Sequence, residues 1–172
     1  MSELIGDWNK LNNILNPTKL RASMKRCAAR VGNYGASEIR KGIVSGAPAG
    51  KTFKPLSALT ISRKGSSKPL IDKGDLVGSV TYQVLNDADS VFIGVKKGKE
   101  VNIAAVHEFG CTIAVTPKMR AYLHHQGVHL RAETTHIHIP ARPFLRPILL
   151  SSDFQNKVKE IYVNALREAF MP

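Results

Sequence analysis

The strongest constraint on the fold is a helical pattern of apolar residues that begins at Asn16-Pro17. Asn can accept hydrogen bonds from the free N–H groups at a helix start, and Pro is tolerated at the first helical position. The sequence therefore predicts a long helix over residues 17–44. Its apolar face, with a break around two glycines, consists of Leu20, Met24, Cys27, Ala28, Val31, Ile39 and Ile43.

The other face of this predicted helix is basic, with Glu38 as its single acidic residue. The whole chain shares the bias, with 25 Lys and Arg against 13 Asp and Glu and a formal net charge of +12. Such a surface attracts nucleic acid, a membrane face or acidic protein, and charge alone does not choose between them. A solvated face and a docking surface for acidic protein or DNA both remain open for Lys19, Arg21, Lys25, Arg26 and Arg30.

The length of 172 residues suits one domain, 1–172, which can bury a core without disulfides or metals. Cys27 and Cys111 lie far apart without C-x-x-C spacing, which argues against a zinc ribbon or disulfide framework and favours synthesis in a reducing cytoplasm. The N-terminal segment, 1–16, has no basic region before an apolar run, and no later segment approaches 18 apolar residues. We expect neither a standard export signal nor a membrane partner.

Residues 46–75 are rich in Gly, Pro, Ser and Lys and show no sustained period. Loops beyond about 12 to 15 residues in compact domains are usually functional or disordered. We therefore predict a long loop or extended arm. Its apolar residues could anchor it to its own domain or to a neighbouring subunit, and they are Phe53, Leu56, Leu59 and Ile61.

Alternating apolar and polar residues predict strands after the arm. Residues 80–84 and 91–95 have the pattern of an antiparallel hairpin that turns at 86–89. A helical turn ending at Gly110, strand candidates at 112–116 and 137–139, and a second hairpin within 119–134 follow. Ser152 begins an S-x-x-Q capping box, which predicts a closing helix to about Phe170. The order predicts an α+β fold in which an antiparallel sheet packs against both long helices.

Two short motifs resemble enzyme signatures and fail on inspection. SGAPAGKT at 45–52 approaches a phosphate-binding loop, but Ser45 stands where the first glycine is needed and a helix, not a strand, precedes it. His107-Glu108 begins like the zinc-binding H-E-x-x-H, but Cys111 replaces the second histidine. We expect His107 and Glu108 to make polar contacts at a turn or an interface. No catalytic signature is found elsewhere, so no enzymatic activity and no cofactor are expected.

Five of the six histidines lie between positions 124 and 138. On a strand, His136 and His138 share one face, because side chains repeat every second residue. An imidazole from a paired strand, such as His124, could complete a zinc or nickel site. The alternative is that these side chains face water or a neighbouring subunit.

The stretch THIHIPARPFLRP at 135–147 is governed by its prolines. Residues before proline are pushed toward extended conformations, which biases the segment away from helix. It is best interpreted as a strand that continues through a stiff turn into the last helix. Phe144 and Leu145 are then expected as buried anchors and Arg142 as a charged contact.

Four segments stand in a fixed order along the chain: FKPLSALTISRKG (53–65), PLIDKGDLVGSV (69–80), VHEFGCTIAVT (106–116) and IPARPFLRP (139–147). Together they resemble the virion-morphogenesis or tail-completion family of tailed bacteriophages. Three departures, Phe53 for a common tryptophan, Lys73 for Thr or Ser and Cys111 for a frequent glycine, affect packing and turns and no reacting group.

The resemblance implies a structural protein of the virion neck, made in the host bacterial cytoplasm, that completes the tail or joins it to the filled head. Related neck proteins form rings, often sixfold, around the DNA channel. Implied partners are further copies of the chain, the connector, the tail terminator, the tail tube and channel DNA. A tail terminator is the alternative within this class, and a nucleic-acid-binding protein with a histidine-bound metal, such as a nuclease, is the alternative outside it. We expect the interface to include Phe53, Leu56, Ile61, His107, Glu108, Arg142, Phe144 and Leu145.

Overall fold

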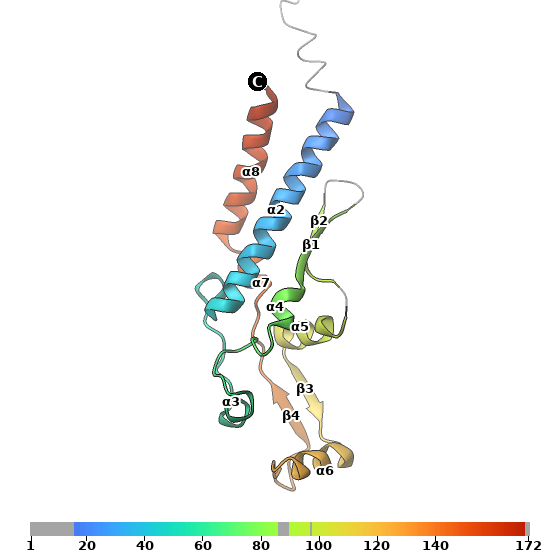
Figure 1. Ribbon diagram of the computed structural model, residues 1–172, viewed down its shortest axis with the longest axis vertical. Helices are drawn as coiled ribbons and strands as arrows, with labels where there is room; N and C mark the ends of the chain where they lie inside the picture. Colours follow the sequence, from blue (N-terminus) through green and yellow to red (C-terminus); the bar gives the residue numbers. More distant parts are fainter. Residues whose placement is uncertain (1–15, 86–89, 97, 171–172) are drawn as a thin grey trace, which may run out of the picture.

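The computed structural model describes residues 16–85, 90–96 and 98–170. The predicted N-terminal segment before Asn16 and the turn at 86–89 lie outside the described residues. The molecule is elongated, with two long helices at one end and a small sheet with a helix at the other (Figure 1). The α+β class is confirmed.

Helix α2, Pro17–Ser45, confirms the predicted long helix. The Asn16 side chain accepts hydrogen bonds from the backbone N–H groups of Thr18 at 3.0 Å and Lys19 at 3.3 Å, as the cap predicted. The helix ends where Gly46 adopts the left-handed conformation, φ 76°.

Strands β1 (Val80–Val84) and β2 (Val91–Val95) form the predicted antiparallel hairpin. The hairpin packs on α2, and the break in the helical pattern marks the contact. A Cβ atom on Gly32 would lie 2.3 Å from the Tyr82 ring, and one on Gly35 would lie 2.7 Å from Ile93. The two glycines therefore let the hairpin approach the helix backbone.

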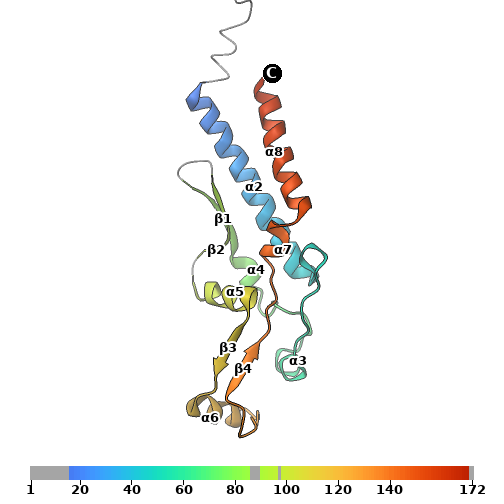
Figure 2. The same ribbon diagram turned by 180° about the vertical axis from the view of Figure 1, so that it is seen from behind.

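Helix α8, Ser152–Phe170, packs on the side of α2 away from the hairpin (Figures 1 and 2). The Phe154 ring stacks on Tyr34 with centroids 5.8 Å apart. The predicted cap is displaced by one residue, because the Ser151 hydroxyl accepts the hydrogen bond from the Phe154 N–H at 3.2 Å. A short helix, α7 (Arg146–Leu149), precedes α8.

The predicted loop or arm over 46–75 contains a short helix that the sequence did not predict, α3, Ala58–Lys64. Ser57 caps its start, and Gly65 ends it with φ 71°. A helix of seven residues is too short to show a sustained apolar period. Two other short helices bound the arm: η1 (Pro48–Gly50) and α4 (Asp75–Ser79).

The remaining elements form a second sheet instead of extending the first. Strands β3 (Cys111–Ala114) and β4 (His136–Ile139) pair antiparallel with each other, after helix α5 (Lys99–Phe109). The predicted hairpin within 119–134 is wrong, because α6 (Pro117–His125) occupies its first half. The Thr116 side chain accepts from the Met119 N–H at 3.2 Å, so Thr116-Pro117 is a helix start.

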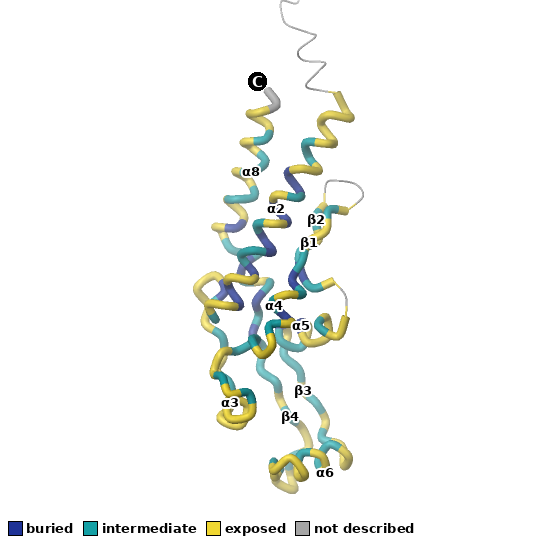
Figure 3. The backbone as a smooth tube through the Cα atoms, viewed as in Figure 1, coloured by how far each residue is buried: buried dark blue, intermediate teal, exposed yellow. Residues whose placement is uncertain are grey.

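Buried residues concentrate in the middle of the molecule (Figure 3). Within the described residues, none is buried in α6, β3 or β4, in α2 before Cys27, or in α8 after Phe154. None of the described helices is long and apolar enough to cross a membrane. The central core consists of Ala36, Ile39, Ile43, Leu76, Val80, Ala104, Phe144 and Ile148.

Candidate assembly interface

Glu108, near the end of α5, is 6% exposed and holds the start of α7. Its carboxylate accepts hydrogen bonds from the backbone N–H groups of Phe144 at 2.8 Å, Leu145 at 3.0 Å and Arg146 at 2.9 Å. These N–H groups lie at a helix start, where no acceptor within the helix is available. One buried carboxylate therefore fixes the turn between β4 and α7.

Arg142 fastens the arm to the same turn. Its Nε donates to the Lys54 carbonyl at 2.7 Å, and its Nη2 donates to the Pro55 carbonyl at 2.8 Å. The Arg142 backbone N–H donates to the His107 carbonyl at 2.6 Å. Burial lowers the pKa of the Arg142 guanidinium. The planar fork of an arginine suits two adjacent acceptors, so this one side chain joins the arm to the body.

Three of the residues expected at a subunit interface therefore make their contacts within their own chain. Glu108 and Arg142 bond to their own backbone, and Phe144, with no exposed surface, packs in the central core. Leu145 and Phe53 also pack against this core while remaining partly exposed. The Arg142 side chain contacts the arm of the same chain.

His107 lies under the arm, next to Arg142. It lines a groove of about 640 Å³ between α3 and the body, together with Leu56, Leu59 and Ile103. Its Nδ1 is buried and has no hydrogen-bond partner within the described structure. Burial lowers the pKa of His107, and the charges of Arg142 and Lys64 add to the effect.

An apolar hollow of about 290 Å³ lies on the other side of α5, against β2. Phe109 at its edge is 62% exposed, and the Arg146 guanidinium lies 5.0 Å above the centre of its ring. Phe92 and Val101 of the same hollow are also exposed. Aromatic and arginine side chains dominate the binding energy of many protein interfaces. The sequence reasoning missed this pair, although Phe109 follows Glu108 and lies about 100° from it around the helix.

The basic face of α2 is fully on the surface. Its residues are exposed. The interpretation as a docking surface therefore stays open for Lys19, Arg21, Lys25, Arg26 and Arg30.

The three candidate metal ligands, His124, His136 and His138, do not form one group. His136 and His138 share the exposed face of β4 as predicted, but His124 lies on α6 and not on a paired strand. Its ring contacts His129 instead, with centroids 4.5 Å apart. The residues that the structure describes contain no group of three His, Cys, Asp or Glu side chains arranged to hold a metal.

A model of the phage virion morphogenesis family matches residues 7–167. The chain belongs to the phage virion morphogenesis family. No curated protein and no solved structure matches it. Membership confirms the resemblance seen in the sequence and assigns the chain to the assembly of a phage virion.

The four segments that resemble the phage virion morphogenesis family meet at one junction. Segment 53–65 supplies the carbonyls that Arg142 binds, and segment 106–116 supplies Glu108. Segment 69–80 contributes Leu76 and Val80 to the core that surrounds Phe144. In this member of the family, each of the four segments contributes residues to the junction.

Proposed function

We propose that this chain is a structural protein of the phage neck that completes the tail or joins it to the head, and that it acts as a ring of identical copies. Family membership supports a role in virion assembly, and the neck and the ring are the further steps of the proposal. The observation that carries it is the distribution of burial. None of the described residues at either end of the molecule is buried, while large apolar side chains are exposed along its length.

Two apolar surfaces on opposite sides of the body suit a ring. Helix α3 carries exposed Leu59 and Ile61 on one side, and the hollow at α5 and β2 exposes Phe92, Val101 and Phe109 on the other (Figures 1 and 2). A contact between two different surfaces repeats from copy to copy and closes into a ring when the rotation permits. We therefore keep three residues as proposed interface residues: Leu56 and Ile61 of the arm and Leu145 of the hollow. We expect the ring to be sixfold.

Electron microscopy of particles made without this protein tests the proposal. Filled heads and tails that fail to join, or tails that are unstable at the head-proximal end, are expected. Tails of abnormal length would point instead to a tail terminator, and normal joined virions would refute a role in either step.

The ring is tested with the purified protein. Phe109→Ser should reduce the oligomer in native mass spectrometry and leave unjoined particles when it replaces the wild-type protein. Tyr122→Ser is the matched control, because Tyr122 of α6 is also 62% exposed but lies outside the hollow. Equal oligomers for Phe109→Ser and wild type would refute the use of the hollow.

A further inference from the structure

The first fourteen residues of α2, 17–30, carry five cations and no acidic side chain. The helix dipole makes cations unfavourable in the first turn, which holds Lys19. Arg21 with Lys25 and Arg26 with Arg30 are like-charged pairs at i,i+4, which also weaken a helix. The arrangement therefore costs helix stability instead of contributing to it. Cations that weaken their own helix are better explained by an external anion than by the fold.

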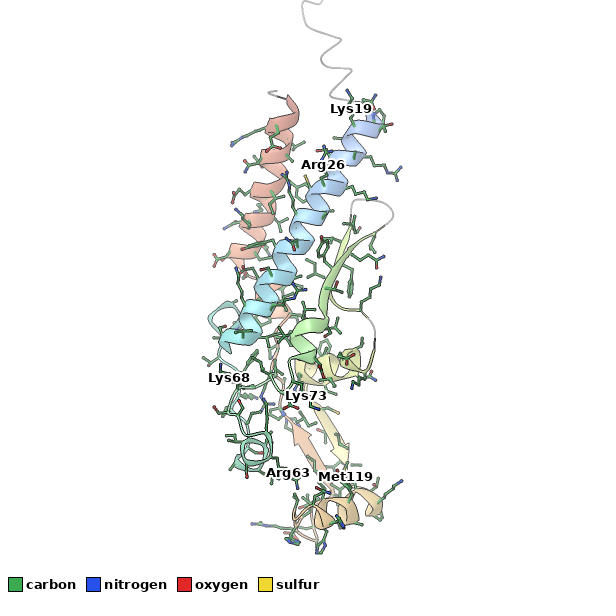
Figure 4. All side chains as sticks on the ribbon, viewed as in Figure 1. Lys19, Arg26, Arg63, Lys68, Lys73 and Met119 are labelled. Carbon is green, nitrogen blue, oxygen red and sulfur yellow. The ribbon has the colours of Figure 1, made fainter. Side chains whose placement is uncertain are left out.

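The cations fall into two groups by helical geometry. At 3.6 residues per turn, Lys19, Arg26 and Arg30 lie within about 40° of one another and span about 16 Å of the helix axis. Arg21 and Lys25 point to another side, where they line a groove of about 560 Å³ with Val84 and Leu85 of the hairpin. Lys19 and Arg26 lie on the part of α2 that projects furthest from the core (Figure 4).

The surface chemistry favours a polyphosphate over an acidic protein. Protein interfaces depend on apolar and aromatic anchors and are depleted of charge at their centre. Between positions 17 and 30, the one large apolar side chain among the described exposed residues is Leu20, 42% exposed, and no aromatic residue is present. A DNA backbone requires only cations that reach its phosphates.

We propose that the face formed by Lys19, Arg26 and Arg30 binds the phosphate backbone of duplex DNA without regard to sequence. This inference rests on the proposed neck position, since that position would bring the helix close to the packaged duplex. Arg21 and Lys25 add to the local positive potential. Binding is electrostatic and weak for one copy, and a ring would repeat it around the duplex.

Fluorescence anisotropy of the purified full-length protein with two short duplexes of unrelated sequence tests the binding. The expected result is equal affinity for both duplexes and a loss of affinity with salt. Three phosphate contacts give a slope of log affinity against log salt of about −2.7 per copy. Absence of binding at low salt, or binding to one duplex alone, overturns the proposal.

The variant Arg26→Glu with Arg30→Glu should lower duplex affinity at least about tenfold at low salt and bring the slope close to −0.9. The control is Lys118→Glu with Arg131→Glu, which makes the same charge change at the α6 end of the molecule and should leave affinity within about twofold. Both control residues are exposed. An equal loss in both variants would show attraction by net charge alone and would overturn the assignment to this face.

Loss of folding is not the expected outcome of the test variant, because both side chains are exposed and glutamate and arginine have similar helix propensities. Circular dichroism should show unchanged helix content, and Arg26→Gln with Arg30→Gln provides a second variant with the same expected loss of binding. Polyglutamate is the competing probe. If it displaces the duplex as well as unlabelled DNA does, the partner is an acidic protein and the proposal is wrong. Because these assays use the isolated protein, their failure is distinct from failure of the neck role, which depends on particle morphology.

Discussion

Replacing Glu108 with alanine tests the central structural claim, that one buried carboxylate fixes the turn into α7. The substitution removes the acceptor for three backbone N–H groups, which lie 2.8, 3.0 and 2.9 Å from the carboxylate oxygens. A hydrogen bond to a charged group contributes about 1.5 to 3 kcal/mol, and three that share one acceptor are not additive. Since two of the three donors are only partly buried, we expect a loss of about 3 to 5 kcal/mol.

Thermal denaturation measures this loss. For a chain of this size, 1 kcal/mol shifts Tm by about 2 to 4 °C, so Glu108→Ala should melt about 6 to 20 °C below wild type. Glu160→Ala is the matched control, because Glu160 is half exposed in a pair with Lys157 and should change stability by less than about 1 kcal/mol. The Tm of Glu108→Gln should lie between the Tm values of Glu108→Ala and Glu160→Ala, since the glutamine amide places a donor against one of the N–H groups. If Glu108→Ala melts within the range of Glu160→Ala, the carboxylate does not hold this turn.

Three further predictions concern the arm, the glycines and the histidine under the arm. Arg142→Lys should speed cleavage of the arm by trypsin after Lys51, because an ammonium cannot reproduce the two-carbonyl fork. Gly32→Ala should destabilise the fold by about 1 to 2 kcal/mol in chemical denaturation, because the Tyr82 ring would lie 2.3 Å from the new Cβ and outweigh the gain in helix propensity. His107→Gln should reduce the loss of Tm that wild type shows on acidification from neutral pH. The sign follows from the lowered pKa of His107, because the unfolded chain takes up the proton first and stability falls as the pH drops below the unfolded value.

Each of these predictions has a control. Arg131→Lys should not change cleavage of the arm. Faster cleavage in both variants would contradict the claim that Arg142 fastens the arm to the body. Gly78→Ala adds a Cβ with nothing within 4 Å, so an equal loss there would contradict the close approach at Gly32. His125→Gln, at an exposed position, should retain the full acid sensitivity of Tm. If His107→Gln retains it as well, another group is responsible.

The sequence predicted elements whose signals are local. The helix α2 was predicted from Asn16-Pro17 and the apolar period. The hairpin was predicted from the alternation of apolar and polar residues. Both signals act over a few residues. It failed at α3 and α6, each shorter than three turns, where too few apolar positions exist to show a period. At α6 the run of histidines resembled a strand face, while the short Thr116-Pro117 start signal was the better indicator.

The candidate site was harder to predict because its contacts are long-range. Arg142 and Glu108 were both identified as important, yet their partners lie 88 and 36 to 38 residues away, and spacing carries no information over such distances. The sequence therefore could not distinguish an arginine that binds another subunit from one that binds its own arm.

Because Arg142 binds its own arm, a substitution at Arg142 is a poor test of assembly. A charge reversal at Arg142 would detach the arm and disturb the groove under it, so failed assembly would report damage to the subunit as readily as loss of a contact. A substitution at Phe109 separates damage to the subunit from loss of a subunit contact, because the Phe109 ring is mostly exposed. Among the described residues, the one ring contact that Phe109 makes is with Arg146. A Phe109→Ser protein that keeps the wild-type Tm but fails to assemble would locate a subunit contact at the hollow. The same failure together with a lowered Tm would return the defect to the fold.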